Sequence, residues 1–207
     1  MPPRVKFTKE EIIDAAVETV RKYGADGLTA RNTALQLRTS THPIFTYYAT
    51  IEDLKRDVYE AAKDIHRRRI ELGLKSKVPF LGVGLQYLAF AKDDPELYKL
   101  LYLSKPDGVT GGAMDSMKMS QDMVRESLMR IYNIDGQTAD CYYRDLWLVV
   151  FSFATLIVTD DCPYTDEQMS AVLTEVSLSV CKAYKEVPGL VCGEYDRDEI
   201  FKELVRK

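Results

Sequence analysis

Helix-start signals recur along this chain, and the residues between them follow helical spacing. Thr8, Thr50 and Thr165 are each followed three positions later by an acidic or amide side chain, which is the spacing of a capping box. Asp94 precedes Pro95, and a proline at the first helical position is a further start signal. Apolar residues recur every three or four positions, and no segment alternates as a strand would. The chain is therefore predicted to be all-α, with about ten helices.

The composition is that of a globular protein that can bury a proper core. The 207 residues are 46% hydrophobic and 29% charged. A net charge of −4 argues against non-specific coating of nucleic acid but leaves room for a local DNA-reading surface. The N-terminal sequence MPPRVKFTKEE lacks the apolar core of a signal peptide. The longest apolar stretch, Leu146–Val158, is too short to span a bilayer, so we expect a cytoplasmic protein without a membrane partner.

Three short helices and a long fourth one are predicted in the first third of the chain. The first begins at Thr8 and ends near Gly24, the second spans about 28–37, the third begins at Ser40, and the fourth spans 51–73. Residues 1–50 are predicted to form a three-helix helix-turn-helix DNA-binding domain. Residues 51–207 are predicted to form a larger helical domain, with the fourth helix as the connector; its role in effector binding and dimerisation is what the family resemblance given below implies.

The stretch STHPIFTYY, residues 40–48, is interpreted as the start of the third helix. Ser40 is its expected N-cap and Pro43 its third residue, where a missing N–H costs nothing because first-turn amides have no helical partner. Ile44 and Tyr48 then face the core one turn apart. The residues that point outward are Thr41, His42, Thr46 and Tyr47.

This third helix has the features of a recognition helix, which presents its N-terminal side chains to base edges in the major groove. Thr41 and His42 are hydrogen-bond donors at that tip, and Tyr47 lies where a phenol hydroxyl reaches a phosphate. Two interpretations of His42 stay open: a donor to guanine or phosphate, or a surface histidine tolerated beside the turn.

Two stretches resemble a known family of regulators. The sequence from TKEEIIDAAVETVRKYGADGLTARNTALQL to STHPIFTYYATIEDL resembles the DNA-binding domain of TetR-family transcriptional regulators, and YLAFAKDDPELYKLLYLS is similar to a segment of that family's ligand-binding domains. The resemblance implies a homodimer that binds a double-stranded DNA operator, most often as a repressor, and releases it when a small hydrophobic effector binds. The candidate DNA-binding residues are Thr29, Arg31, Arg38, Ser40, Thr41, His42, Pro43, Thr46, Tyr47 and Lys55.

The chain departs from the family's pattern at positions that bear on DNA affinity. His42 stands where a glycine often precedes the proline, Arg38 replaces the turn glycine, and Ile51 replaces a lysine. Residues 1–60 hold nine Lys or Arg against nine Asp or Glu, and fewer cations release fewer counterions from DNA. We expect moderate affinity. The alternative is a helical small-molecule-binding protein whose operator recognition is weakened or lost.

The C-terminal part suggests a dimer interface and a pocket. Two long late helices are apolar over wide faces, which favours burial against a second copy about a twofold axis. The dimer-interface candidates are Phe151, Met169, Val172, Leu173, Val176 and Val180. Clustered methionine and aromatic residues suit a hydrophobic ligand, although ordinary core packing gives the same pattern. The effector-pocket candidates are Tyr87, Phe90, Tyr102, Met117, Gln121, Tyr143 and Trp147.

Other functional classes receive little support. We find no Walker loop, HExxH, GxSxG or Rossmann fingerprint, so we expect neither an enzyme nor a bound metal or cofactor. The cysteines have no CxxC spacing, which favours free thiols over a redox switch; they are Cys141, Cys162, Cys181 and Cys192. His66 and the following arginines are interpreted as part of a solvated helix face.

Overall fold

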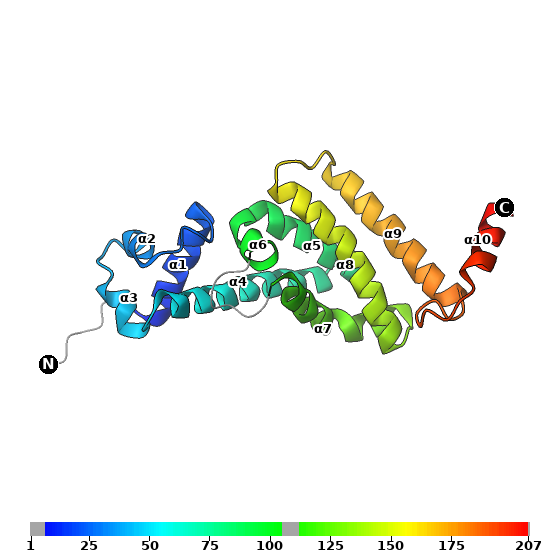
Figure 1. The fold of residues 1–207 in the computed structure, drawn as a ribbon, viewed down its shortest axis with the longest axis horizontal. Helices are drawn as coiled ribbons and strands as arrows, with labels where there is room; N and C mark the ends of the chain where they lie inside the picture. Colours follow the sequence, from blue (N-terminus) through cyan, green and yellow to red (C-terminus); the bar gives the residue numbers. More distant parts are fainter. Residues whose placement is uncertain (1–6, 105–111, 207) are drawn as a thin grey trace.

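The computed structural model describes residues 7–104 and 112–206, and within these ranges every regular element is a helix (Figure 1). The all-α prediction is confirmed. The helices are α1 (Lys9–Tyr23), α2 (Ala30–Gln36), α3 (His42–Tyr47), α4 (Ile51–Leu74), α5 (Pro79–Asp93), α6 (Pro95–Tyr102), α7 (Ala113–Tyr132), α8 (Gly136–Val158), α9 (Asp166–Glu186) and α10 (Arg197–Arg206).

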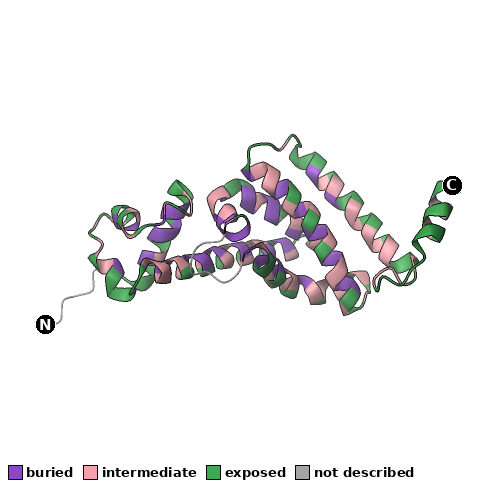
Figure 2. Cartoon of the chain, viewed as in Figure 1, coloured by how far each residue is buried: buried purple, intermediate pink, exposed green. Residues whose placement is uncertain are grey.

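The helices are arranged as a small head and a larger body that share one long helix. The head consists of α1, α2 and α3, and α4 runs from it into the body formed by α5 to α9 (Figure 1). The C-terminal α10 stands apart at the opposite end, where Phe201 is 59% exposed. Buried residues lie on the inner faces of both head and body (Figure 2).

Threonine caps begin three of the helices as predicted. The Thr8 hydroxyl accepts from the Glu11 amide at 3.1 Å, and the Glu11 carboxylate accepts from the Thr8 amide at 2.7 Å. Thr50 and Thr165 form the same reciprocal pair. Asp94 precedes α6 but makes no capping bond, because its carboxylate is engaged by an arginine of the head.

The turn between α2 and α3 differs from its prediction. Arg38 adopts a left-handed conformation with φ 54°, and the Thr39 amide donates to the Ala34 carbonyl at 2.9 Å, as in a Schellman motif. The predicted N-cap role of Ser40 is wrong: Thr41 is the N-cap, with helical dihedrals and no side-chain bond. Capping needs an extended N-cap residue, and helical backbone already resumes at Thr41. Pro43 is consequently the second helical residue.

Close packing of α4 on α5 depends on two glycines. A Cβ placed on Gly73 would lie 2.6 Å from the Val83 backbone, and one on Gly82 would lie 2.4 Å from the Gly73 carbonyl oxygen. Any larger side chain would therefore force these two helices apart. The contact fixes the body half of α4 against α5.

An ion pair ties the head to the body at a second place. Arg21 at the end of α1 donates from Nε to Asp94 Oδ1 at 2.6 Å, and the Asp94 side chain is only 10% exposed. Arg69 of α4 lies 4.0 Å from the other Asp94 oxygen. The hydrogen bond that Arg21 donates to the Asp94 carboxylate raises the pKa of Arg21. Asp94 therefore joins α1, α4 and the α5–α6 junction.

The most apolar helix, α8, lies inside the body. By length and composition it is the one helix among the described residues that passes as a membrane span, with a mean hydropathy of 1.4. Its buried residues, such as Tyr142, Leu146 and Ala154, pack between α5, α7 and α9 (Figure 1). Protein neighbours therefore cover much of its apolar surface.

The strained turn yields a prediction. Arg38→Gly should raise the free energy of unfolding by about 1 kcal/mol, because glycine adopts a positive φ without the steric cost that Cβ imposes. Urea unfolding measures this. Arg38→Ala is the matched control, since it removes the same charge but keeps a Cβ. Equal stability of the two variants would contradict this account of the turn.

Candidate functional site

The outer face of α3 is the first candidate site. Ile44 is fully buried and Tyr48 is 4% exposed, as the sequence predicted, and they anchor α3 in the head. The Tyr48 hydroxyl donates to Asp57 of α4 at 2.9 Å, which fixes α3 against α4. His42, Thr46 and Tyr47 are exposed on the opposite face, while Thr41 and Pro43 are half-buried. The head thus presents a rigidly held face of donors to solvent.

Some of the candidate DNA-binding side chains already have partners. The Tyr47 hydroxyl donates to the Phe7 carbonyl at 3.0 Å, so it must leave that bond before it can donate to a phosphate. Thr46 donates to the His42 carbonyl at 3.1 Å. The Thr29 hydroxyl caps α2 by accepting from the Asn32 amide at 3.1 Å. Thr29 therefore has a structural role, whatever else it contacts.

The candidate cations of the head are uncommitted. Arg31, Arg38 and Lys55 form no ion pair within the described residues 7–104 and 112–206. By contrast, Lys9 pairs with Asp57 at 2.7 Å, and Arg56 pairs with the carboxylate of its own helix turn. The three free cations lie on α2, on the α2–α3 turn and on the first turn of α4. Although the head is neutral overall, they are available to phosphates.

Sequence reasoning missed two exposed apolar residues of the head. Phe45 of α3 is 49% exposed and Leu35 of α2 is 63% exposed. An apolar side chain on a recognition helix can contact a thymine methyl group. Helical spacing gave the signal, because Phe45 follows the buried Ile44 directly and cannot share its face.

A buried aromatic cluster in the body is the second candidate site. His66 of α4 is completely buried, so its predicted position on a solvated face is wrong. Its ring centroid lies 4.9 Å from Phe90, 5.1 Å from Tyr87 and 5.6 Å from Tyr102. His66 lies on the buried stripe of α4, between Ala62 and Ile70 at helical spacing. Aromatic neighbours from α5 and α6 then exclude water from the imidazole.

This cluster holds polar atoms that have no hydrogen-bond partner of normal geometry among the described residues. His66 Nδ1 lies 3.0 Å from the Tyr102 hydroxyl, but Nε2 has no such partner. The Tyr98 hydroxyl lies close enough to Tyr87 and Thr155 for both to affect its pKa, which burial raises, yet none of these three hydroxyls forms a hydrogen bond of normal geometry. Trp147 Nε1 has no partner among the described residues either. Each such buried group costs about 1–3 kcal/mol, so the cluster can gain free energy from a polar ligand.

Most of the predicted effector-pocket residues belong to this cluster or adjoin it. Tyr87, Phe90 and Tyr102 surround His66, and Trp147 stacks on Phe151, whose ring lies 6.3 Å from Tyr102. Burial raises the pKa of Tyr102, and the nearby Tyr143 raises it further. Met117 is 8% exposed. The half-buried Gln121 donates from its amide nitrogen to the Asp140 carbonyl at 3.5 Å.

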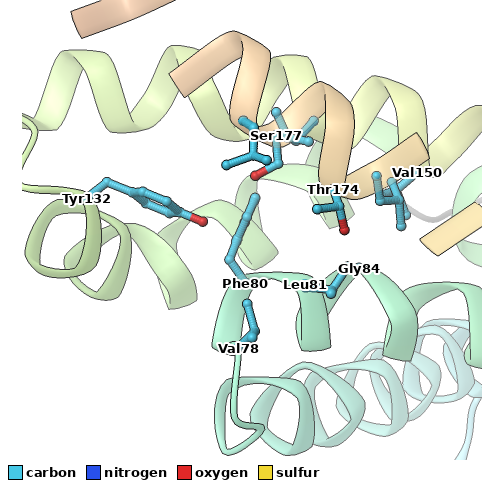
Figure 3. Close-up of a pocket in the computed structure, with 11 residues that line it drawn as sticks. Val78, Phe80, Leu81, Gly84, Tyr132, Val150, Thr174 and Ser177 are labelled. Carbon is cyan, nitrogen blue, oxygen red and sulfur yellow. The ribbon is translucent and has the colours of Figure 1, made fainter. Parts of the chain in front are cut away.

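A separate cavity lies between α5, α8 and α9 (Figure 3). Its volume is about 210 Å³. None of the seven predicted effector-pocket residues lines it. Its wall is formed by Val78, Phe80, Leu81, Gly84, Tyr132, Leu146, Val150, Leu173, Thr174, Ser177 and Leu178.

The predicted dimer-interface residues fall into two groups. Met169 and Leu173 are 1% and 3% exposed and pack into their own chain, so they are not available to a partner. Phe151 also turns inward, onto Trp147. Val172, Val176 and Val180 are half-buried on α9. Leu148, 52% exposed on α8, was missed because α8 is apolar on nearly every side.

The head, the shared long helix and the helical body together define a TetR-like fold. A member of the TetR family from Streptomyces coelicolor A3 has a TM-score of 0.59 at 21% identity, with 84% of this chain and 98% of that chain covered. A TetR variant from Acinetobacter baumannii AYE, solved with minocycline, has a TM-score of 0.58 at 16% identity, covering 87% and 97%.

A third structure, a candidate transcriptional regulator from Pseudomonas aeruginosa PAO1, has a TM-score of 0.66 at 11% identity and covers 88% of this chain and 97% of that chain. No protein-family model matches the chain, and no curated protein matches it in sequence. The likeness is therefore one of fold.

Burial of His66 predicts a pH dependence of stability. Desolvation lowers the pKa of His66 to about 3, whereas the unfolded chain's histidine titrates near about 6.5. The unfolded state therefore binds more protons as the pH falls below the pKa of the unfolded chain's histidine. The free energy of unfolding should decrease by about 2–3 kcal/mol between about pH 7.5 and 4.5. His66→Gln should remove that part of the slope in urea unfolding, and His42→Gln, at the exposed histidine, should not. Equal slopes in all three proteins would contradict the assignment.

Proposed function

We propose that this protein is a ligand-responsive, DNA-binding regulator of transcription. It acts in the cytoplasm as a homodimeric repressor that a small hydrophobic effector releases from its operator. The observation that carries the proposal is the anchoring of α3. Ile44 and Tyr48 fix one face of the helix in the head, so His42 and Thr46 are held outward. Base-edge readout requires such a rigid and exposed helix at the tip of a helix-turn-helix.

Roles follow from chemistry for the residues of this face. Thr41 and His42 lie at the leading end of α3, where side chains reach base edges, and Phe45 offers an apolar contact to thymine. Arg31, Arg38 and Lys55 supply charge for phosphates. The Tyr47 hydroxyl also binds phosphate, by exchanging its hydrogen bond to the Phe7 carbonyl for one to a phosphate oxygen. Ser40 and Pro43 shape the approach to the helix.

The proposed dimer uses the exposed face of α8 at Leu148 and the half-buried valine edge of α9, which also packs against the chain's own core. Val172, Val176 and Val180 recur at helical spacing on α9, and Leu148 is the large exposed apolar side chain of α8. An isologous contact of these faces places two heads on one side of a twofold axis. A dimer of this kind reads two half-sites about one DNA turn apart.

The proposed effector site is the buried cluster around His66. The imidazole is neutral, and the unpartnered atoms include the acceptor or donor at Nε2 and the hydroxyls of Tyr87 and Tyr98. An uncharged ligand with hydrogen-bonding groups can satisfy these atoms, whereas a charged one would meet no counterion among the cluster residues. A ligand that satisfies them shifts the population toward the conformation in which they are accessible.

Substitutions in the head distinguish the contribution of base recognition to DNA binding from the contribution of positive charge. On DNA recovered by selecting host genomic fragments with the purified protein, His42→Ala should weaken binding about 10- to 100-fold and leave binding to random DNA unchanged. Arg38→Ala should weaken binding to both and lower the salt slope by about one. Arg130→Ala in α7 is the control. No enrichment of fragments would favour the small-molecule-binding alternative.

A charge on the outer face of α8 tests the dimer. Leu148→Glu should shift the protein from dimer to monomer in sedimentation equilibrium, because two carboxylates would be buried across the twofold axis. Leu72→Glu places the same charge on a comparably exposed leucine of α4 and should leave the dimer intact. Dissociation by both variants, or by neither, would count against this interface.

A further inference from the structure

The cavity between α5, α8 and α9 has the geometry of a ligand site. Its volume of about 210 Å³ exceeds the roughly 150 Å³ of an apolar cavity that binds benzene. Phe80 and Leu81 of α5 and Leu146 of α8 line it, and Figure 3 shows Phe80 and Gly84 on the side of the cavity opposite Thr174 and Ser177 of α9.

The lining defines the chemistry of the ligand. None of the lining residues is charged, so an ionised ligand would be desolvated without compensation. Three lining hydroxyls, those of Tyr132, Thr174 and Ser177, lie around the cavity in Figure 3. Thr174 donates to the Ser170 carbonyl at 2.9 Å and Ser177 shares a 2.5 Å hydrogen bond with Tyr142, so both are held in place. They retain lone pairs for a ligand hydroxyl.

The cavity opens on a flank of α9 that the proposed dimer does not use. Leu178 is 66% exposed and Val78 is 52% exposed at the mouth. Val176 and Val180 each lie two positions from Leu178, and two positions in an α-helix correspond to about 200°. Leu178 at the mouth therefore points away from the proposed dimer stripe, whereas Leu173 and Ser177 of the lining directly follow Val172 and Val176 and lie nearer to it. A ligand that enters past Leu178 does not cross the valine stripe.

We infer that this cavity is a second small-molecule site, distinct from the cluster around His66, for an uncharged aromatic or alicyclic compound that carries a hydroxyl group. The apolar walls pack against the ring. The ligand hydroxyl forms hydrogen bonds with the hydroxyl groups of Tyr132, Thr174 and Ser177. Bound there, the ligand joins α5 to α9 and fixes the position of α9.

Gly84 provides the variant that tests the site. A Cβ at this position would lie 3.4 Å from Leu173 Cδ1 and 3.6 Å from Val150 Cγ2, which is ordinary contact. Gly84→Leu therefore fills the cavity without a backbone clash, and leucine is favoured over glycine within a helix. Ala171→Leu adds similar apolar bulk to the exposed part of α9 outside the cavity and is the matched control.

The experiment is calorimetric titration of the full-length protein with 2-naphthol and with 2-naphthoate, which has the same ring system but an ionised group. We expect one 2-naphthol per chain, at least 10-fold weaker binding to Gly84→Leu, and unchanged binding to Ala171→Leu and His66→Gln. 2-Naphthoate should bind at least 10-fold more weakly than 2-naphthol. Circular dichroism melting confirms that each variant is folded.

Three results would overturn the inference: no saturable binding, binding to Gly84→Leu as tight as to the unsubstituted protein, or equal affinity for 2-naphthoate. Loss of 2-naphthol binding in His66→Gln but not in Gly84→Leu would move the ligand to the His66 cluster and leave the proposed regulatory function intact. Loss of DNA binding in the head variants bears on the proposed function alone.

Discussion

The continuity of α4 is the constraint on which the rest of the structure depends. This single helix of 24 residues contributes Leu54 and Val58 to the core of the head, and His66 and Ile70 to the core of the body. Because a helix of this length has no internal hinge here, its two halves move together. A change in the packing of α4 against the body therefore also changes the orientation of the head.

Two contacts fix α4 and the head relative to the body. Gly73 sits against α5 so closely that a methyl group would not fit, which holds the far end of α4 in place. Asp94 connects Arg21 of the head with Arg69 of α4, so α1 cannot move freely relative to the α5–α6 junction. His66 lies about one helical turn before Arg69 on α4, among polar atoms that have no partner within the described residues. A ligand that rearranged this region would act on the part of α4 that the head must follow.

Local signals in the sequence predicted the head well, because its helices begin and end at residues whose side chains act on adjacent backbone. The capping boxes and the buried pair Ile44 and Tyr48 are examples. At the start of α8 the Asp135 carboxylate acts in the same way, by accepting from the Thr138 amide. Ser40 failed as a cap because α3 begins at His42, one residue later than the sequence suggested, and Thr41 holds the N-cap position.

The body was harder to predict because its sites depend on which helices meet. His66 stands in the stretch KDIHRRR, between Ile65 and three arginines, so most of its neighbours in sequence are charged while its neighbours in space are aromatic rings. Met169 and Leu173 form an apolar stripe that fits either a partner or the chain's own core, and only the packing of α9 on α8 and α5 decides between them. The cavity beside Gly84 depends on three helices at once, and no local pattern marks it.

The central claim is that two identical heads, spaced by a dimer of bodies, read DNA with the exposed face of α3. Hydroxyl-radical footprinting of genomic DNA recovered with the purified protein tests it most directly. The account predicts two protected half-sites in inverted orientation, with centres about 34–36 Å, or one helical turn, apart or a multiple of that spacing. A single protected patch, or uniform protection that shows no preferred sequence, would contradict it.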